Sequence, residues 1–305
     1  MSTKIRRPRR CQLAVPGSSS KMIAKATETA ADHVFLDLED AVAPNAKPAA
    51  RRQVVTAIND LDWGRKTLSV RINDVGTKWC YGDVIAVVEG AHARLDTIIV
   101  PKVTKPSDVL FVATLLDQIE SNLGIAKRIG LELLIEEVEG LADVDAIAKA
   151  SPRTESLIFG MGDYSASHGI DVRFLSSAGS GGYPGDVWYY PRFRLVMAAR
   201  AAGIDAVDGP FASFKNEDAY REECRRALTL GCVGKWAIHP AQIEAAQEIF
   251  TPRPEDIARA REVAAAYARA EAEGAGSVNV GGIMVDAATV RILSNILQRA
   301  ETLGM

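Results

Sequence analysis

Eight short apolar segments divide this 305-residue chain, and nearly all of them end on a charged or polar residue. Between consecutive segments the apolar residues recur with helical spacing, which is the pattern of repeated strand–helix units. Eight such units predict a closed (β/α)8 TIM barrel, a fold of about 250 residues whose active sites lie where the strands end. The predicted strands are Gln12–Val15, Val34–Leu38, Thr67–Ile72, Thr97–Val103, Leu131–Ile135, Ser156–Met161, Ile204–Val207 and Lys235–Ile238.

The remaining chain predicts two additions to a barrel domain at residues 11–250. Residues 1–10 form a basic N-terminal arm, which we expect to be disordered unless it is a cationic presequence. Residues 251–305 form a C-terminal helical extension, in which an alanine-rich helix over Pro254–Glu273 is followed by a glycine break. The segment 281–286 then leads into a final helix. A glycine hinge before this segment suggests either a lid, which closes a site or reaches a neighbouring subunit, or an ordinary tail.

Composition excludes several classes of function. A formal net charge of −3 provides no field for nucleic acid or an anionic membrane. No long apolar segment predicts a membrane span. The four cysteines lack C-x-x-C spacing, which favours a reducing cytoplasmic setting without disulfides or a zinc site. The glycine- and serine-rich stretch 176–185 has no P-loop pattern, and we expect it to be a functional loop on the active-site side.

Two carboxylates follow adjacent predicted strands, Glu136 after the fifth and Asp163 after the sixth. Two carboxylates completed by waters and substrate oxygens suit Mg²⁺, and Mn²⁺ has similar preferences. The alternative is that they only neutralise Arg71 or Lys102. The pattern alone does not separate Glu136 from the nearby Glu137 and Glu139, because successive strand residues face opposite sides.

Further polar residues end other predicted strands. Arg71 has the fixed fork that suits a carboxylate or an enolate oxygen. Lys102 is equally suited to an anionic substrate group and to a structural salt bridge. His239 and His168 are each either a general base or a packed structural residue. The acidic group Asp37, Glu39 and Asp40 supplies either partners for Arg71 and Lys47 or residues that orient metal-bound water.

Several short motifs occur in a fixed order along the chain. Those of the first half are Val15-Pro-Gly-Ser18, Leu36-Asp-Leu-Glu-Asp-Ala-Val42, Val70-Arg-Ile-Asn73, Val100-Pro-Lys102 and Gly160-Met-Gly-Asp-Tyr164, and those of the second half are Gly185-Asp-Val-Trp188, 198–210 and 234–243. In this order they resemble the CitE-like, HpcH/HpaI-type aldolase and lyase superfamily, from about Cys11 to the C-terminus. The second half most resembles L-malyl-CoA/β-methylmalyl-CoA lyases. In the usual pattern the metal glutamate is not followed by further acids, whereas here Glu137 and Glu139 follow it.

The resemblance implies an Mg²⁺-dependent, reversible Claisen-type cleavage of L-malyl-CoA to acetyl-CoA and glyoxylate, and of β-methylmalyl-CoA to propionyl-CoA and glyoxylate. Glu136 and Asp163 match the metal ligands, and Arg71 matches the arginine that stabilises the enolate. Asp286 matches a catalytic lid aspartate donated by a neighbouring subunit, which implies a homo-oligomer, either a trimer or a hexamer. We expect backbone N–H groups at Gly162 and Asp163 to bind glyoxylate. The candidates for the CoA phosphates are Arg10, Lys21, Lys25 and Lys102.

Three other functions stay open at this point. A (3S)-malyl-CoA thioesterase would keep the same fold and site. A citramalyl-CoA lyase would accept pyruvate in place of glyoxylate, a difference of one methyl group that changes binding by only about 1–3 kcal/mol. A partner-dependent citrate lyase β-type subunit would need an acyl-carrier protein, and the lid aspartate argues against it.

Overall fold

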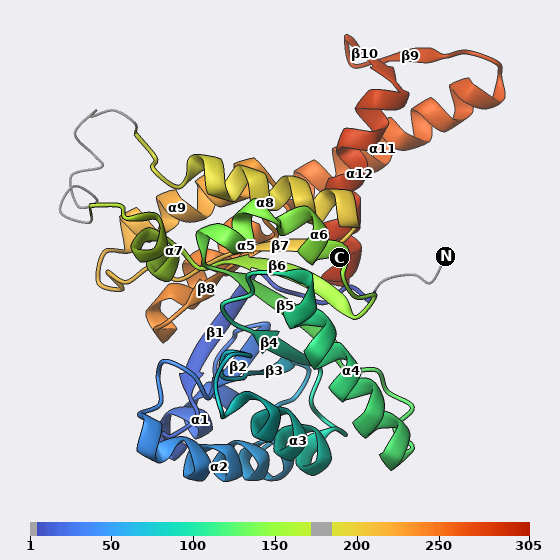
Figure 1. The fold of residues 1–305 in the computed structure, drawn as a ribbon. Coiled ribbons are helices and arrows are strands. Elements are labelled where there is room, and N and C mark those ends of the chain that lie inside the picture. Colours follow the sequence, from blue (N-terminus) through green and yellow to red (C-terminus); the bar gives the residue numbers. More distant parts are fainter. Residues whose placement is uncertain (1–4, 172–184) are drawn as a thin grey trace.

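The fold is an eight-stranded parallel barrel closed by pairing of its first and last strands, seen in a computed structural model that describes residues 5–171 and 185–305. Each of the eight predicted strands is confirmed, with end positions that shift by a few residues. Figure 1 shows helices packed around the barrel. The strands are β1 (Cys11–Pro16), β2 (His33–Asp37), β3 (Thr67–Arg71), β4 (Thr97–Val100), β5 (Gly130–Ile135), β6 (Thr154–Phe159), β7 (Asp205–Asp208) and β8 (Gly234–Ala237).

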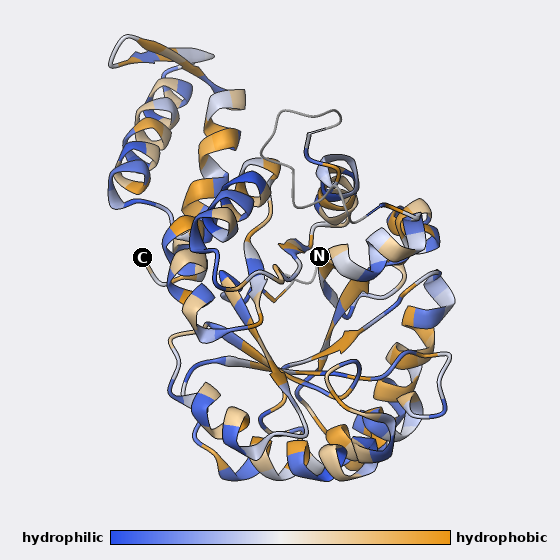
Figure 2. Cartoon of the chain, turned by 90° about the vertical axis from the view of Figure 1, so that its left-hand side faces the viewer, coloured by the Kyte–Doolittle hydropathy of each residue, from blue (hydrophilic) through white to orange (hydrophobic). Residues whose placement is uncertain are grey.

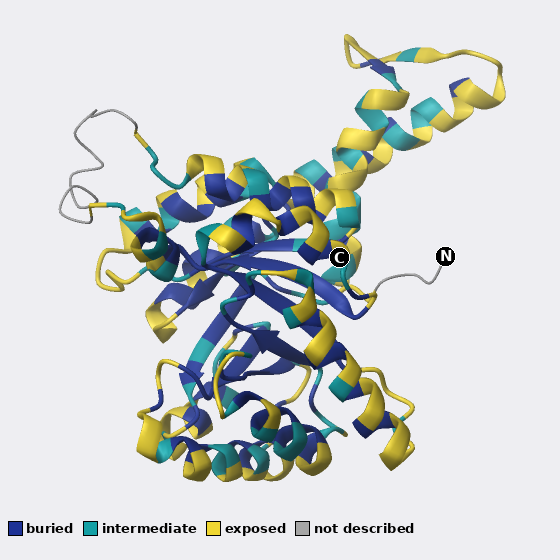
Figure 3. Ribbon diagram, in the orientation of Figure 1, coloured by how far each residue is buried: buried dark blue, intermediate teal, exposed yellow. Residues whose placement is uncertain are grey.

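The helices between the strands bury their apolar faces against the barrel, so that the strands are almost entirely buried (Figure 3). The helices are α1 (Ser20–Thr27), α2 (Lys47–Asp60), α3 (Cys80–Ala91), α4 (Pro106–Leu123), α5 (Val138–Ala142), α6 (Val144–Lys149), α7 (Met161–His168), α8 (Tyr189–Ala202), α9 (Glu217–Leu230), α10 (Ile243–Phe250), α11 (Pro254–Ala272) and α12 (Ala287–Thr302), with short 3-10 turns η1 (Pro44–Ala46) and η3 (Pro240–Gln242).

Among the described residues, no helix combines the length and apolar character needed to cross a membrane. The predicted glycine- and serine-rich loop at 176–185 lies outside the described residues except for Gly185.

The interior of the barrel is layered. Its middle layer is apolar and consists of Phe35, Ile99, Leu134, Ile158, Val207 and Trp236, which form a cluster of their own. Because alternate strand residues face the interior, Glu132 of β5 lies below Leu134, and Glu136, directly after the strand, lies above it. Polar layers therefore lie on both sides of the apolar one, and the upper layer opens at the C-terminal ends of the strands, where the active sites of TIM barrels lie.

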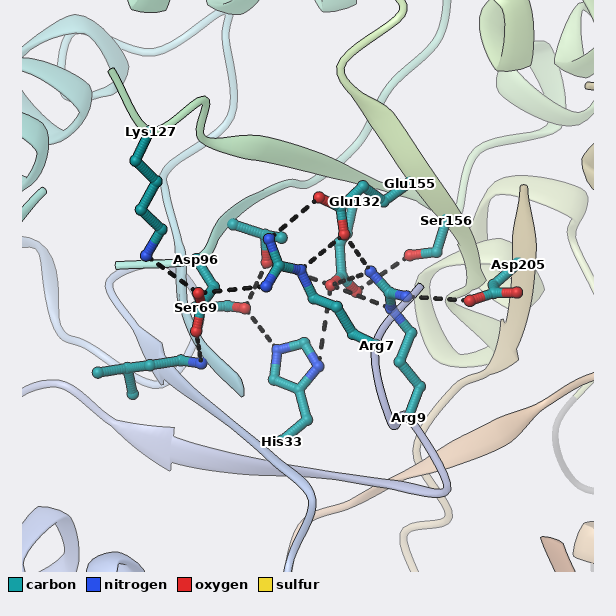
Figure 4. A network of polar contacts seen from close by, with 12 residues as sticks. Arg7, Arg9, His33, Ser69, Asp96, Lys127, Glu132, Glu155, Ser156 and Asp205 are labelled. Atoms are coloured by element: carbon teal, nitrogen blue, oxygen red, sulfur yellow. Dashed lines mark hydrogen bonds and ion pairs between the residues drawn. The ribbon is translucent and has the colours of Figure 1, made fainter. Parts of the chain in front are cut away.

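The lower layer is closed by the N-terminal arm (Figure 4). Arg9 is fully enclosed, and its guanidinium donates to Glu132 at 3.3 Å, Glu155 at 2.6 Å and Asp205 at 2.9 Å. Arg7 donates to Glu155 at 2.8 Å. The prediction of a disordered arm is therefore wrong for residues 5–10, because buried carboxylates at the base of the barrel require cations and the arm supplies them.

The C-terminal extension is a helical hairpin capped by two short strands. α11 packs on α12, and β9 (Ser277–Val280) pairs antiparallel with β10 (Ile283–Asp286). We predicted no strands here. Gly281 and Gly282, with φ of 60° and 84°, form a two-residue turn that needs positive φ at both positions. Figures 1 and 2 show that this β-hairpin projects well clear of the barrel.

We predict that Arg9→Met destabilises the protein by about 3–5 kcal/mol at pH 7, because it leaves buried carboxylates unpaired. Burial alone would raise the pKa of Glu132, but Arg9 and its other partners outweigh burial and lower this pKa to about 2. In the wild type this stabilisation is complete above pH 4.5 and is lost as the pH falls toward 2. The difference between variant and wild type, measured by denaturant unfolding, should therefore shrink below pH 4.5.

Arg6→Met is the matched control, because its side chain is 42% exposed and lies 3.9 Å from Asp205. Its expected cost is below about 0.5 kcal/mol. Adding Glu132→Gln to Arg9→Met should recover part of the loss. If Arg9→Met cost no more than Arg6→Met, the arm would not be the counter-ion of the lower layer.

Candidate active site

The upper polar layer brings together side chains from three strands. Asp37 ends β2, Arg71 ends β3, and Glu136 immediately follows β5. Arg71 binds Asp37 through two parallel hydrogen bonds, of 2.8 Å from Nε and 2.6 Å from Nη2. Its remaining terminal nitrogen, Nη1, lies 3.0 Å from Glu39 Oε2. The guanidinium is thus held in a fixed orientation, with its carbon 5.7 Å from the ring centre of Trp236 in the apolar layer.

The acidic residues after β2 pair with Arg71, as one of our two interpretations predicted. Lys102 also binds this group, with its Nζ 2.6 Å from Glu39 and 3.3 Å from Asp40. The other part of that interpretation is wrong, since Lys47 forms no ion pair with Asp37, Glu39 or Asp40. Its ammonium donates to the carbonyl oxygens of Leu38 and Glu39 and to the amide oxygen of Asn73.

Glu136 is 3% exposed and accepts a hydrogen bond of 3.0 Å from the backbone N–H of Lys102. Burial raises the pKa of this carboxyl well above its usual range, and the negative charges of Glu39 and Asp163 raise it further against the opposing effect of Arg71. Glu137 is half-buried and Glu139 is exposed on α5. Glu136 is therefore the acid of this group that lies in the upper layer.

Asp163 lies in the first turn of α7, half-buried, and its charge acts on Glu136. The neighbouring Gly162 is exposed, and no heavy atom lies within 4 Å of the position that a side chain would occupy. The first N–H groups of a helix have no acceptor within the helix. The start of α7 thus presents a carboxylate and backbone donors at the open end of the barrel.

The donor chemistry of this site fits a divalent cation. Glu136 and Asp163 make no ion pair with a basic side chain in the described part of the chain. Burial first, and then the negative charges of Glu39 and Asp163, raise the pKa of Glu136 against the opposing effect of Arg71. No group of three or more His, Cys, Asp or Glu residues suited to a metal occurs among the described residues. Two carboxylates with water suit Mg²⁺, which rarely takes a complete set of protein ligands.

The cations predicted for the CoA phosphates lie in different places. Lys21 and Lys25 are exposed on α1, which follows β1 on the open side of the barrel. Lys102 is engaged by Glu39 and Asp40, as described above. Arg10 precedes β1 at the opposite end, where it binds Asp32 at 2.6 Å. The prediction for Arg10 is therefore wrong, because the depth of the barrel separates it from Glu136.

The two histidines singled out in the sequence, His239 and His168, make their hydrogen-bond and ring contacts with residues other than Glu136 and Asp163 in the described part of the chain. His239 begins η3, accepts a hydrogen bond from the Ala241 N–H at 3.2 Å and stacks on Phe214 at 4.6 Å. With Phe214 it lines a cavity of about 310 Å³ after β7 and β8. His168, at the end of α7, is exposed and lies against Tyr164. The contacts of His239 fit the structural interpretation better than the general base.

One buried cluster was not predicted. Asp208 ends β7 but points outward, and it binds Arg192 of α8 at 2.9 Å and Lys235 of β8. Trp188, one residue before α8, donates to Ser165 of α7 at 3.0 Å. The Trp188 hydrogen bond connects the start of α8 with α7, the helix that carries Asp163. No signal in the sequence distinguishes Arg192 from an ordinary surface arginine of a helix.

The family assignment follows from comparison with known proteins. The model of the HpcH/HpaI aldolase/citrate lyase family matches residues 10–240. This chain belongs to that family. It is 42% identical to the L-malyl-CoA/β-methylmalyl-CoA lyase of Rhodobacter capsulatus over 300 residues, covering 96% of this chain and 94% of the relative. It is 33% identical to a (3S)-malyl-CoA thioesterase of Cereibacter sphaeroides, covering 97% and 96%. The predicted resemblance is therefore confirmed.

Two solved structures have the same overall fold as this chain. A citrate lyase of Burkholderia xenovorans superposes with a TM-score of 0.85, covering 99% of this chain and 94% of that one; at 23% identity it supports the fold alone. The protein CitE of Mycobacterium tuberculosis, solved with magnesium, acetoacetate and coenzyme A, is 30% identical with a TM-score of 0.73 and covers 98% and 100%. Magnesium therefore occurs in a family member with this fold.

Gly160 gives a direct test of the position of Glu136. A Cβ at residue 160 would lie 2.5 Å from the Cβ of Glu136 and 2.6 Å from its Oε2, so Gly160→Ala must displace this carboxylate. We expect Mg²⁺ affinity, measured by calorimetry, to fall by about tenfold or more. Gly162→Ala is the control: its Cβ enters open space, and the expected result is unchanged thermal stability with Mg²⁺ binding retained. Equal Mg²⁺ affinities of Gly160→Ala and wild type would contradict the assignment of Glu136.

Proposed function

We propose that the protein is an Mg²⁺-dependent carbon–carbon lyase that cleaves L-malyl-CoA to acetyl-CoA and glyoxylate, and β-methylmalyl-CoA to propionyl-CoA and glyoxylate. The observation that carries this proposal is 42% identity over 96% of the chain to a lyase of that name. The pair Glu136 and Asp163 supports it, because their positions after β5 and in the first turn of α7 suit the ligands of one cation. Mn²⁺ has similar ligand preferences.

The mechanism assigns one task to each residue of the upper layer. A cation held by Glu136 and Asp163 supplies a Lewis acid for the oxygens of glyoxylate. The N–H groups of Gly162 and Asp163 bind the glyoxylate carboxylate, as helix N-termini bind anions. Arg71, oriented by Asp37, stabilises the enolate oxygen of the CoA thioester. Glu39 and Asp40 lie next to the third terminal nitrogen of Arg71 and would orient water bound to a cation at this site.

In the synthetic direction Asp286 removes a proton from the acetyl methyl group, and the resulting enolate carbon attacks the aldehyde carbon of glyoxylate. The alkoxide formed on the former aldehyde oxygen then takes up a proton from solvent. Cleavage reverses these steps: the hydroxyl group loses its proton, its oxygen forms the C=O of glyoxylate as the carbon–carbon bond breaks, the electrons of that bond form the enolate, and Asp286 returns a proton to the enolate carbon. A thioester α-proton is weakly acidic, so this base depends on Arg71 and on a site from which water is excluded. CoA phosphates would bind the exposed Lys21 and Lys25, whereas Lys102 has little freedom to do so.

Asp286 would reach the site of another subunit. It ends β10, on a hairpin that projects away from its own barrel (Figure 1). There its carboxylate caps α12, and hydrogen bonds from the N–H and hydroxyl of Thr289 hold its pKa below the usual range. An active base needs a higher pKa, which loss of these hydrogen bonds on entering a drier site would provide. We propose a trimer or hexamer in which the extension of each chain completes its neighbour's site.

Mixing of two inactive variants tests this arrangement. Asp286→Ala and Glu136→Gln should each lower turnover on the order of 10³-fold, the typical effect of losing a general base or a metal ligand. Co-expressed subunits that assemble at random would regain activity in about a quarter of the sites, because one subunit provides Glu136 and its neighbour provides Asp286. No recovery in verified mixed oligomers would place Asp286 in the site of its own chain.

A second candidate is a (3S)-malyl-CoA thioesterase, favoured by the relative at 33% identity. The fold and the upper layer do not separate the two reactions, but the products do. A partner-dependent citrate lyase β-type subunit would be inactive on free CoA thioesters.

We also propose a cytoplasmic setting, supported by four free cysteines that are all buried.

Incubation with L-malyl-CoA, with and without Mg²⁺, distinguishes these functions. Glyoxylate is trapped as its phenylhydrazone while free thiol is titrated in parallel. The lyase predicts glyoxylate equimolar with acetyl-CoA, no free thiol and complete dependence on a divalent cation. Free thiol without glyoxylate would identify a thioesterase, and neither product would exclude both reactions on this substrate.

A further inference from the structure

Lys102 has an unusual backbone conformation next to the proposed metal ligand. Its φ is 50°, in the left-handed region, and it is the single residue other than glycine with positive φ in the described part of the chain. L-residues adopt this region at a cost in free energy, whereas glycine does so freely. Strained backbone of this kind tends to persist where the surrounding structure enforces it.

The residues on both sides of Lys102 are fixed. Pro101 is buried directly after β4. Val103 is completely buried, and its N–H donates to the carbonyl of Leu134 at 3.4 Å. The carbonyl of Val103 packs against Gly140, where a Cβ would lie only 2.2 Å from the oxygen. The chain therefore turns at Lys102 between two positions that have no freedom to move.

This turn directs two groups of one residue to two parts of the site. The backbone N–H of Lys102 donates to Glu136 Oε1 at 3.0 Å. Its Nζ lies 2.6 Å from Glu39 Oε1, and the other oxygen of Glu39 lies 3.0 Å from Arg71. Lys102 is thus the direct link between the proposed metal ligand and the group that orients Arg71.

A glycine would make the same turn without strain. If only the amide mattered, lysine would be a poor choice at this position. Lysine at φ of 50° makes physical sense when its side chain contributes as well, through the ion pairs with Glu39 and Asp40. The sequence suggested an anion-binding role for this ammonium, but its contacts are with protein carboxylates.

We propose that Lys102 is a positioning residue: its left-handed backbone fixes Glu136 for the cation, and its side chain fastens the same turn to the acidic partners of Arg71. This inference rests on the proposed function, because it takes Glu136 as a metal ligand. If residue 102 positions Glu136, Mg²⁺ affinity should follow the ease with which this residue adopts positive φ. A turn with a purely structural role would not change Mg²⁺ affinity in this way.

Lys102→Gly and Lys102→Ala test this requirement as a matched pair. Both lose Nζ, and they differ in the ease of the left-handed conformation. We expect the glycine variant to bind Mg²⁺ about five- to tenfold more tightly than the alanine variant in calorimetry, a typical effect for groups that orient a metal ligand. Lys102→Asn, which tolerates left-handed backbone better than alanine, should fall between them and replaces either variant that does not fold.

Lys105, in the same loop, provides the control pair. Its φ is −155°, ordinary extended backbone, so Lys105→Gly and Lys105→Ala should bind Mg²⁺ equally. Lys102→Arg restores a cation that can pair with Glu39 and should bind Mg²⁺ within about threefold of the wild type. Thermal unfolding without Mg²⁺ establishes that each variant is folded.

The outcomes separate this inference from the proposed function. Equal affinities of Lys102→Gly and Lys102→Ala, or tighter binding by alanine, would overturn the positioning role and leave the proposed lyase intact. A wild type that binds no Mg²⁺ would remove the metal site and this inference together. A wild type that binds Mg²⁺ with the expected order of variants, but cleaves no L-malyl-CoA, would support the positioning of Glu136 and refute the reaction.

Discussion

The balance of charge at the two ends of the barrel interior determines how this molecule is built. Glu132 on β5 and Glu136, the residue directly after this strand, lie on the same face with the apolar residue Leu134 between them. Both are buried, yet their pKa values shift in opposite directions. Arg9 and other partners lower that of Glu132 to about 2, whereas burial and neighbouring acids raise that of Glu136. At the lower end the cations pair with Glu132, whereas at the upper end Arg71 and Lys102 pair with other acids and leave Glu136 without an ion pair among the described residues.

This asymmetry explains why the upper end is suited to bind a cation and the lower end is not. Arg71 is near Glu136, but Asp37 already engages two of its nitrogens and Glu39 the third. Burial also raises the pKa of Glu39, to about 7, despite its contacts with Arg71 and Lys102. The local positive charge is therefore fully used by the acidic residues after β2. A divalent cation between Glu136 and Asp163 would supply the missing charge, and it would favour the ionised form of Glu136.

Most of the fold could be predicted from the sequence, because strands buried on both faces give continuous apolar runs of a recognisable length. The position of Glu136 could not be separated from that of Glu137 until the register of β5 placed Glu132 on the interior face. The arm was missed because arginines at a chain end are typical of solvated segments, and only tertiary contacts show Arg9 among three carboxylates. The hairpin of β9 and β10 was missed because four-residue strands carry little periodic signal, although Gly281-Gly282 is typical of a tight hairpin turn.

The C-terminal extension carries the hairpin that could cover the open end of the barrel. Deprotonation next to a thioester needs a dry site, but the start of α7 is open, with empty space around Gly162. The residues suited to cover such an opening lie on the hairpin, where Ile283 and Met284 are 60% and 70% exposed and have no apolar cover in this chain's described residues. A single chain thus carries an open site and an exposed apolar hairpin that projects away from it (Figure 2). Two surfaces that cannot meet within one molecule can meet between molecules, and repetition of that contact closes into a ring when the rotation permits. In the proposed oligomer, assembly and catalysis would depend on the same contact, because the contact that buries the hairpin would also exclude water from Arg71 and Glu136.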